Sequence, residues 1–244
     1  MATPVNATVT YSISATNAGG YSSISQGVAY ADEPFFGLTF AVTANPDPVC
    51  NLANSNITLF TVGPNTLPTG YAASNATTTA DEEILGVSIG TGGSLINTTS
   101  TCATTGGAAA NGLPASVVSQ YSNYTGSFAP AVMSSGDVIP FTLTLGYCSG
   151  NTYSNTSAIY IDLNRNGVFD MPTERLYMSA NNNGGSAAGS SFTRSGTITI
   201  PTTGIMPGYT LMRIVHVESA TNNPTGTFSW GETEDYLVNL KGTL

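Results

Sequence analysis

Short runs of alternating apolar and polar residues recur along the whole chain. The clearest lie at residues 5–15, 38–43, 57–62, 84–89, 138–145, 157–163, 196–200, 210–217 and 235–240. A period of two places every second side chain on one face of a strand. Clusters of Gly, Asn and Ser, such as residues 17–20 and 181–185, separate the runs and are typical of turns. The pattern predicts an all-β fold, an antiparallel β-sandwich of jelly-roll or immunoglobulin-like type with extra N-terminal strands.

Helical periodicity is nearly absent, and residues 108–120 are the one stretch where we expect a short helix. The segment Gly-Pro-Asn-Thr-Leu-Pro at residues 63–68 is the best candidate for a domain boundary. We therefore expect N-terminal strands in residues 1–66, which either extend the sandwich or form a small unit used in assembly. The sandwich itself is expected in residues 67–244.

The most distinctive chemistry lies in the loop after the predicted strand at residues 157–163. Oxygen-bearing side chains alternate there, a glycine stands at the sixth position, and an acidic residue follows at the thirteenth. Calcium takes six to eight oxygen ligands, and alternate residues of a tight loop can all point inward. The sequence predicts one Ca²⁺ whose ligands are Asp162, Asn164, Asn166, the Val168 carbonyl, Asp170 and Glu174.

An alternative interpretation of this loop stays open. An EF-hand ends in a bidentate Glu at position 12, whereas here position 12 is Thr173 and the residues before the loop are strand-like. Asn, Asp and Gly also dominate ordinary turns, because their side chains bond to nearby backbone. A metal-free, Asx-rich turn is therefore the competing hypothesis.

Composition limits the classes of partner. Lys and Arg number 5 against 14 Asp and Glu, a net charge of −9, so nucleic acid and anionic membranes are not expected partners. No run of about eighteen apolar residues exists, so no membrane span is expected. Few charges and abundant Ser, Thr, Asn and Gly are typical of secreted and cell-surface proteins, and we expect an extracellular location. Of the three cysteines, Cys50, Cys102 and Cys148, two can form a disulfide and one is left over.

Polar residues near the C-terminus have two interpretations. Glu232 and Glu234 share one face of an extended strand, so they could hold the same or another cation, or bond to turn backbone or to Arg213. Asp235 faces the opposite side and is the expected partner of Arg213. His216, the only histidine, is expected to be structural, because no Gly-x-Ser-x-Gly elbow accompanies it. Trp230 and the tyrosines could stack on sugars, but core packing is the expectation.

Five ordered landmarks resemble the GEVED domain family of secreted and surface proteins. They are the acidic segment at residues 81–84, the Tyr-Ser-Asn-Tyr-Thr segment at 121–125, the loop at 162–174, the strand at 208–213, and Gly-Glu-Thr-Glu-Asp at 231–235. This resemblance implies an extracellular β-sandwich and supplies no reaction. It also implies a disulfide between Cys50 and Cys102. Asn166 replaces the usual Asp, which should weaken calcium binding, and Thr233 replaces the usual Val.

These features predict a non-enzymatic extracellular structural or adhesin-like surface protein, stabilised by calcium and able to form a fibre. A carbohydrate-binding accessory domain of a secreted enzyme is the alternative, and a hydrolase that uses paired carboxylates is a third hypothesis. The expected partner is a second copy of the chain or a cell-surface glycan. Residues 5–14 alternate without Lys, so they could be an edge strand of the same molecule or a strand donated to a neighbour.

Overall fold

The computed structural model describes residues 7–16, 22–31, 60–61, 63–79, 81–149, 151–185 and 187–243. The chain divides into two compact units, Met1–Ile57 with Leu244, and Thr58–Thr243. The larger unit begins ahead of the proline-containing segment at residues 63–68, because Phe60–Thr61 (β3) pairs with the end of the C-terminal strand. The predicted strand at residues 38–43 and Cys50 lie outside the described residues.

The described part of the smaller unit is a β-hairpin. β1 (Ala7–Thr16) pairs antiparallel with β2 (Ser22–Ala31), in a register that runs without interruption from Ala7 opposite Ala31 to Thr16 opposite Ser22. The strand predicted from the alternation at residues 5–15 is confirmed as β1. Its partner is β2, so β1 is part of a separate two-stranded sheet.

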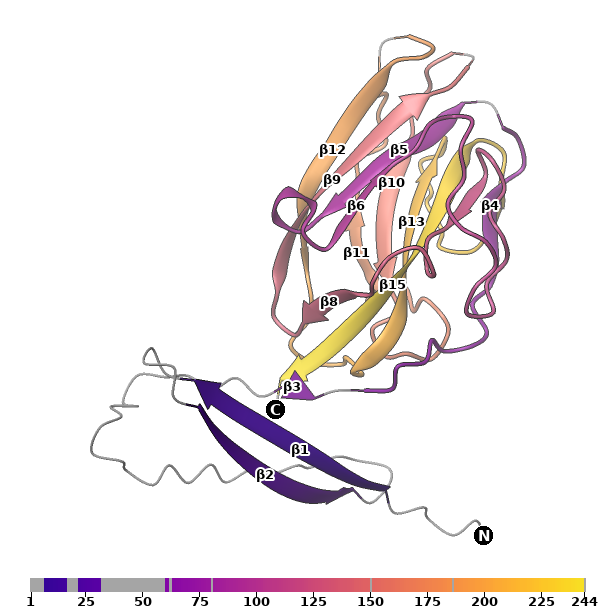
Figure 1. The fold of residues 1–244 in the computed structure, drawn as a ribbon. Helices are drawn as coiled ribbons and strands as arrows, with labels where there is room; N and C mark the ends of the chain where they lie inside the picture. The colour runs from indigo at the N-terminus through magenta and orange to yellow at the C-terminus, as the bar shows by residue number, and fades with distance from the viewer. Residues whose placement is uncertain are drawn as a thin grey trace. The chain divides into compact units, whose positions relative to one another are not determined.

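The larger sheet of the Thr58–Thr243 unit has seven strands (Figure 1). Its main path runs β11, β10, β13, β15 and β3, and β7 and β8 also pair with β15. The bounds are β7 Tyr121–Asn123, β8 Ala131–Ser134, β10 Thr156–Ile161, β11 Arg175–Met178, β13 Gly208–Val217 and β15 Gly231–Thr243. β15 thus pairs with β13 on one side and with three short strands, one after another, on the other.

The second sheet has four antiparallel strands in the order β12, β9, β5 and β6. Their bounds are β5 Glu82–Ile89, β6 Ile96–Thr99, β9 Val138–Tyr147 and β12 Ser191–Thr199. A small parallel pair joins β4 (Ser74–Ala76) to β14 (Gly226–Phe228), and the one described helix is a 3₁₀ turn at Thr91–Gly93. No helix in the described parts of the chain is long and apolar enough to cross a membrane.

The main core lies between the two sheets. Alternate residues of β5, β9, β10, β13 and β15 fill it, among them Ile84, Leu143, Ile161, Ile214 and Val238. A second apolar cluster, which includes Tyr160, Leu211 and Phe169, covers the other face of the seven-stranded sheet. The fold is therefore all-β and a sandwich, as predicted. Burial on both faces explains why every residue of β10 is buried and why residues 158–161 are apolar without alternation.

The short helix expected at residues 108–120 is wrong. This segment forms turns and isolated bridges between Ala110 and Leu113 and between Val117 and Tyr121. Asn111 and Gly112 adopt φ of 52° and 77°, and Ser119 adopts 56°. Left-handed residues break a right-handed helix, and the proline inside the segment removes a further donor.

The disulfide predicted between Cys50 and Cys102 is also wrong: Cys102 pairs with Cys148, with a Cα–Cα distance of 5.6 Å. The sheet topology gives the reason. β6 and β9 are the two neighbours of β5 and both run antiparallel to it, so both end beside its first residues. Cys102 follows β6 and Cys148 follows β9, and the Cys148 amide donates to the Asp81 carbonyl at 2.9 Å.

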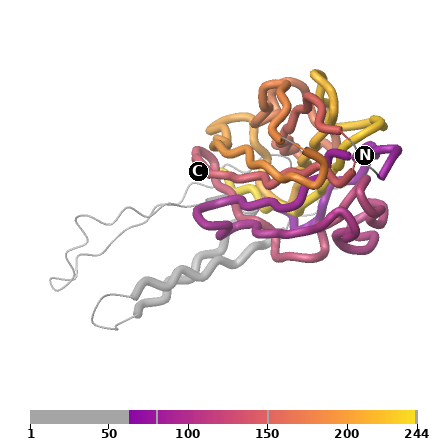
Figure 2. The backbone as a smooth tube through the Cα atoms, turned by 90° about the horizontal axis from the view of Figure 1, so that it is seen from above, coloured from indigo at the N-terminus to yellow at the C-terminus, as the bar shows by residue number. Residues whose placement is uncertain are grey.

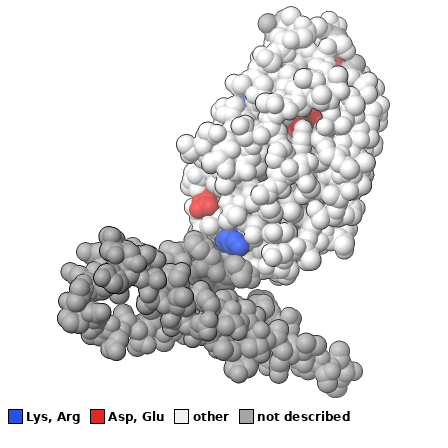
Figure 3. Space-filling view, in the orientation of Figure 1, with Lys and Arg blue, Asp and Glu red and all other residues white. Residues whose placement is uncertain are grey.

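Figure 2 shows the backbone of the larger unit from above, from its purple first residues to yellow β15. The face shown in Figure 3 consists almost entirely of uncharged side chains, with isolated acidic and basic groups. The sequence, with only 8% charged residues, leads to the same expectation.

Candidate metal site

Residues 162–174 form the loop between β10 and β11. Two left-handed residues, Arg165 at φ 57° and Gly167 at φ 82°, turn the chain back on itself. A Cβ at Gly167 would lie 2.3 Å from the Thr69 carbonyl oxygen, so only glycine fits there. Arg165 fastens the loop from outside, because its guanidinium donates to the carbonyls of Tyr209 and Thr66 at 2.9 and 3.0 Å.

Asp162 stands at the base of the loop and is fully buried. Its Oδ1 accepts the Asn166 amide at 3.2 Å, and its Oδ2 accepts the Gly167 amide at 3.0 Å. The Tyr71 hydroxyl also donates to Oδ2, at 2.5 Å. Burial and Asp162 itself raise the pKa of Tyr71, so this phenol remains a donor at physiological pH. Sequence reasoning did not find Tyr71, since nothing in its local sequence marks it.

The two asparagines each link backbone to a carboxylate. Asn164 Oδ1 accepts the Asn166 amide at 3.0 Å, and Asn166 Oδ1 accepts the Val168 amide at 2.8 Å. Their Nδ2 groups both donate to Asp170 Oδ2, at 2.7 and 2.8 Å. Asp162, Asn164, Asn166 and Asp170 are thus brought together, as predicted.

Glu174 closes the loop and is almost completely buried. Its Oε1 accepts the amides of Leu163 and Asn164 at 2.8 and 3.1 Å, and its Oε2 accepts the Asp170 amide at 2.7 Å. Burial raises the pKa of Glu174, and the three backbone donors oppose this rise. The main structural role of Glu174 is therefore to accept hydrogen bonds from the backbone of the loop and so to fix its conformation.

The oxygen atoms of the loop are of the kinds that a hard cation binds. Asp162 Oδ1 and the Oδ1 atoms of Asn164 and Asn166 each accept one hydrogen bond, which leaves a second lone pair on each. The second oxygen of Asp170 and the carbonyl of exposed Val168 belong to the same turn. Carboxylate, amide and carbonyl oxygens at flexible geometry are the ligands that calcium takes.

Glu232 and Glu234 lie elsewhere. Register places Glu232 opposite His216 on β13, whereas Ile161, which precedes the loop, is opposite Met212. Glu232 Oε1 accepts the Ser122 hydroxyl at 2.7 Å and Oε2 accepts the Ile84 amide at 3.0 Å. Glu234 accepts the Tyr236 hydroxyl at 2.6 Å. Burial raises the pKa of both glutamates, and the structure does not bring them to the loop at 162–174.

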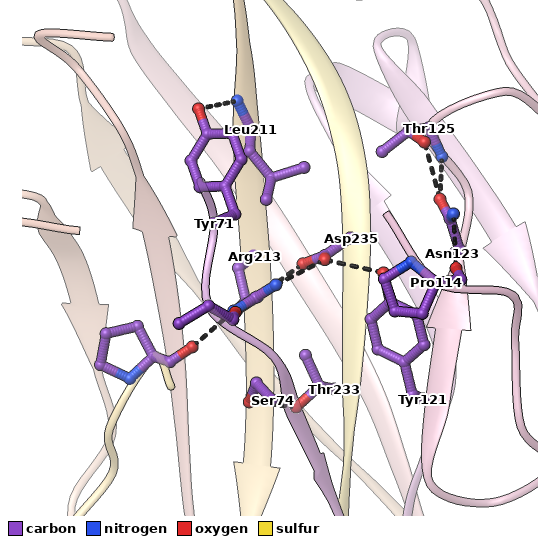
Figure 4. Close-up of polar contacts among 12 residues, drawn as sticks. Tyr71, Ser74, Pro114, Tyr121, Asn123, Thr125, Leu211, Arg213, Thr233 and Asp235 are labelled. Atoms are coloured by element: carbon purple, nitrogen blue, oxygen red, sulfur yellow. Dashed lines mark hydrogen bonds and ion pairs between the residues drawn. The ribbon is translucent and has the colours of Figure 1, made fainter. Parts of the chain in front are cut away.

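The predicted pairing of Arg213 with Asp235 is confirmed (Figure 4). Arg213 Nε and Nη2 each donate at 2.7 Å to one oxygen of Asp235, and both side chains are buried. The remaining Arg213 nitrogen, Nη1, donates to the carbonyls of Ala72 and Pro224 at 2.8 Å. The Tyr121 hydroxyl donates to Asp235 at 2.9 Å. This network holds two loops onto the outer face of the larger sheet.

His216 is fully buried between the sheets. Its Nδ1 donates to the Thr156 carbonyl at 3.2 Å and lies 3.0 Å from the Ser157 hydroxyl. Burial lowers the pKa of His216 to about 3, so the imidazole is neutral at pH 7. Trp230 is 42% exposed beside the acidic motif, so the core packing expected for it is incomplete.

One part of the chain matches the model of a known protein family. No curated protein matches the chain. The match to a family model covers β10, β13 and most of β15, and it includes the loop at 162–174 and the Arg213–Asp235 pair. Residues 156–239 match the GEVED domain, so the resemblance inferred from the sequence is confirmed for this part of the chain.

Proposed function

We propose that the protein is a non-enzymatic, extracellular structural or adhesin-like surface protein, whose sandwich is stabilised by Ca²⁺ bound in the loop at 162–174. The main support is that polar side chains of the GEVED-matching region are buried and hydrogen-bonded to other residues of the fold. Arg213, Asp235 and His216, which could otherwise serve chemistry, are buried and bonded within the sheets. The disulfide between Cys102 and Cys148 agrees with an oxidising compartment.

The calcium site is supported by the geometry of the loop. Asp162, Asn164, Asn166 and Asp170 would hold the ion with the Val168 carbonyl, and Glu174 would hold the backbone that presents them. A cation would neutralise two carboxylates in a loop where Arg165 points outward to the carbonyls of Tyr209 and Thr66.

We expect chelation to destabilise the larger unit. A ligand at a hundredfold excess over its Kd stabilises the folded state by about 2.7 kcal/mol, so EDTA should lower Tm by roughly 5–10 °C for a domain of this size. Asp170→Asn should reduce the calcium-dependent shift, because it keeps an acceptor for the two Asn amides and removes only the charge. Differential scanning calorimetry with and without Ca²⁺ measures both.

Asp137→Asn is the matched control. Asp137 lies in the turn between β8 and β9, where its Oδ2 accepts the Ser134 amide at 2.7 Å, a bond that an asparagine can keep. It should retain the full calcium-dependent shift. An Asp170→Asn variant that responds to Ca²⁺ like the parent protein would exclude this loop as a calcium site.

Self-assembly is the structural role that we propose for the N-terminal unit. An isolated two-stranded sheet is marginally stable in water, and the exposed edge of a strand can pair with another copy. A head-to-tail contact that does not close makes a filament. We expect filaments by negative-stain microscopy of the full chain in Ca²⁺, and their loss on deletion of residues 1–16 without a change in the Tm of the larger unit. A full-length protein that sediments as a monomer at high concentration would contradict assembly.

A carbohydrate-binding role is the second candidate, and exposed Trp230 is the observation that favours it. A pocket of about 190 Å³ is lined by residues that shortly precede Trp230 in the sequence, among them Ser219, Thr221, Asn223 and Phe228. Hydroxyl and amide side chains beside aromatic rings suit sugars. A glycan array distinguishes this candidate from the first.

A further inference from the structure

Three carboxylates converge at one end of the sandwich, away from the loop at 162–174. Asp81 and Glu82 stand at the start of β5, in the four-stranded sheet, and Glu218 follows directly after β13, in the seven-stranded sheet. One oxygen from each lies within 4.8 Å of the others. Glu218 lies inside residues 156–239, which match the GEVED domain, whereas Asp81 and Glu82 lie outside them. We call it the Asp81–Glu82–Glu218 cluster.

The environment of the Glu82 carboxylate indicates a binding site. It is fully buried, and neither of its carboxylate oxygens accepts a hydrogen bond from any described residue. The buried Oδ1 of Asp81 is in the same condition. Glu232, which is equally buried, accepts a hydroxyl and an amide. Buried carboxylates are normally paired or hydrogen-bonded, so the unpartnered oxygens indicate that a ligand is missing.

The neighbouring donors are already used. Asn155 Nδ2 donates to the Tyr147 hydroxyl and to the Tyr153 carbonyl, at 2.9 and 3.1 Å. The single ion pair among the described residues joins Arg213 to Asp235, so no basic side chain neutralises the cluster. Burial, together with Asp81 and Glu218, raises the pKa of Glu82 to about 8. Burial also raises the pKa values of Asp81 and Glu218.

The donor set selects the class of ligand. It consists of carboxylate oxygens alone, which suits a hard cation such as Ca²⁺ and not a metal that prefers nitrogen or sulfur. Bond lengths of 2.3–2.6 Å mean that two oxygens bound to one Ca²⁺ lie at most about 5.2 Å apart, and the three oxygens of the cluster, all within 4.8 Å of one another, satisfy this limit. Glu218 is partly exposed, so the cluster can be reached from solvent.

We propose that Asp81, Glu82 and Glu218 form a second cation site, which binds Ca²⁺ and connects the first strand of the four-stranded sheet to the end of β13. The ion satisfies the unpartnered oxygens of Glu82 and balances the negative charge that the three carboxyl groups carry when they bind it. The site lies beside the disulfide, since the Cys148 amide bonds to the Asp81 carbonyl. It does not depend on calcium binding in the loop at 162–174.

Calorimetric titration of the demetallated full chain with Ca²⁺ tests the site. The parent should bind two ions, Glu82→Gln one, and Asp170→Asn one, so each variant identifies the site that it retains. Without calcium, Glu82→Gln should unfold at the same or a higher temperature than the parent, because an amide carries no charge to neutralise. With saturating Ca²⁺ the order should reverse, which a folding defect alone would not produce.

Glu83→Gln is the matched control, since it changes the adjacent buried glutamate outside the cluster. Burial and Glu232 raise the pKa of Glu83, which favours its neutral form, and a glutamine has nearly the same shape. This variant should still bind two ions. Glu218→Gln, at a partly exposed position, provides a second test that does not disturb the interior.

Equal stoichiometry and an equal calcium-dependent Tm shift in parent and Glu82→Gln would overturn the site, whatever the result at Asp170.

Discussion

Replacing Asp235 by alanine should lower the free energy of unfolding by about 3–5 kcal/mol, which corresponds to a fall in Tm of roughly 6–20 °C for a domain of this size. The change leaves the Arg213 guanidinium buried without its counter-charge, 1% exposed and between two loops. A surface ion pair would contribute about 0–1 kcal/mol. Urea unfolding followed by tryptophan fluorescence measures the difference.

The double variant Arg213→Met with Asp235→Leu is the control for this prediction. It removes both charges and replaces them with apolar side chains, which is often neutral for a buried pair. Its cost should be smaller than the sum of the two single costs, because each single variant leaves one unpaired charge inside. A loss below about 1 kcal/mol for Asp235→Ala would mean that water or another partner reaches Arg213 in the folded state.

Removing the disulfide by Cys148→Ser should destabilise the larger unit by about 4 kcal/mol on the chain-entropy model. The bridge closes a segment with a sequence separation of 46 residues, so its loss frees a long stretch of the unfolded chain. Cys102→Ser should have the same effect, and the two changes together should cost no more than one. Thermal unfolding under oxidising conditions gives the values.

Cys50→Ser is the comparison for this series and should leave Tm unchanged. Non-reducing peptide mapping of the parent should recover Cys102 linked to Cys148. Recovery of Cys50 linked to Cys102, or a Cys148→Ser protein as stable as the parent, would count against the bridge.

Local pattern predicted most of the long strands, because one buried face imposes a period of two over many residues, but it did not predict the ten-residue β2. β5, β9, β13 and β15 all lie where alternation or a continuous apolar run placed them. β7 and β8 have three and four residues and were not predicted, since so few positions carry no periodic signal. They form because they pair with the edge of β15 that β13 leaves free. This is a tertiary interaction, which the β-propensity of a short segment does not reveal.

The candidate sites also differ in how far they could be predicted from local sequence. The loop at 162–174 is local, so the spacing of its oxygens could be read directly from the sequence. The Asp81–Glu82–Glu218 cluster joins residues more than 130 positions apart, and only the packing of two sheets brings them together. The prediction of the disulfide was wrong because it also depends on tertiary structure. Which cysteines pair is decided by which strands flank β5.

The position of β15 has a consequence for the biosynthesis of the protein. The last strand of the described chain is central in the larger sheet, and β3, β7 and β8 all pair with it from much earlier in the sequence. During synthesis the N-terminal part of the chain leaves the ribosome first. The strands β3, β7 and β8 therefore have no partner until residues 231–243 have also emerged. Such long-range pairing folds slowly. The larger sheet consequently cannot be completed until the synthesis of β15 has ended.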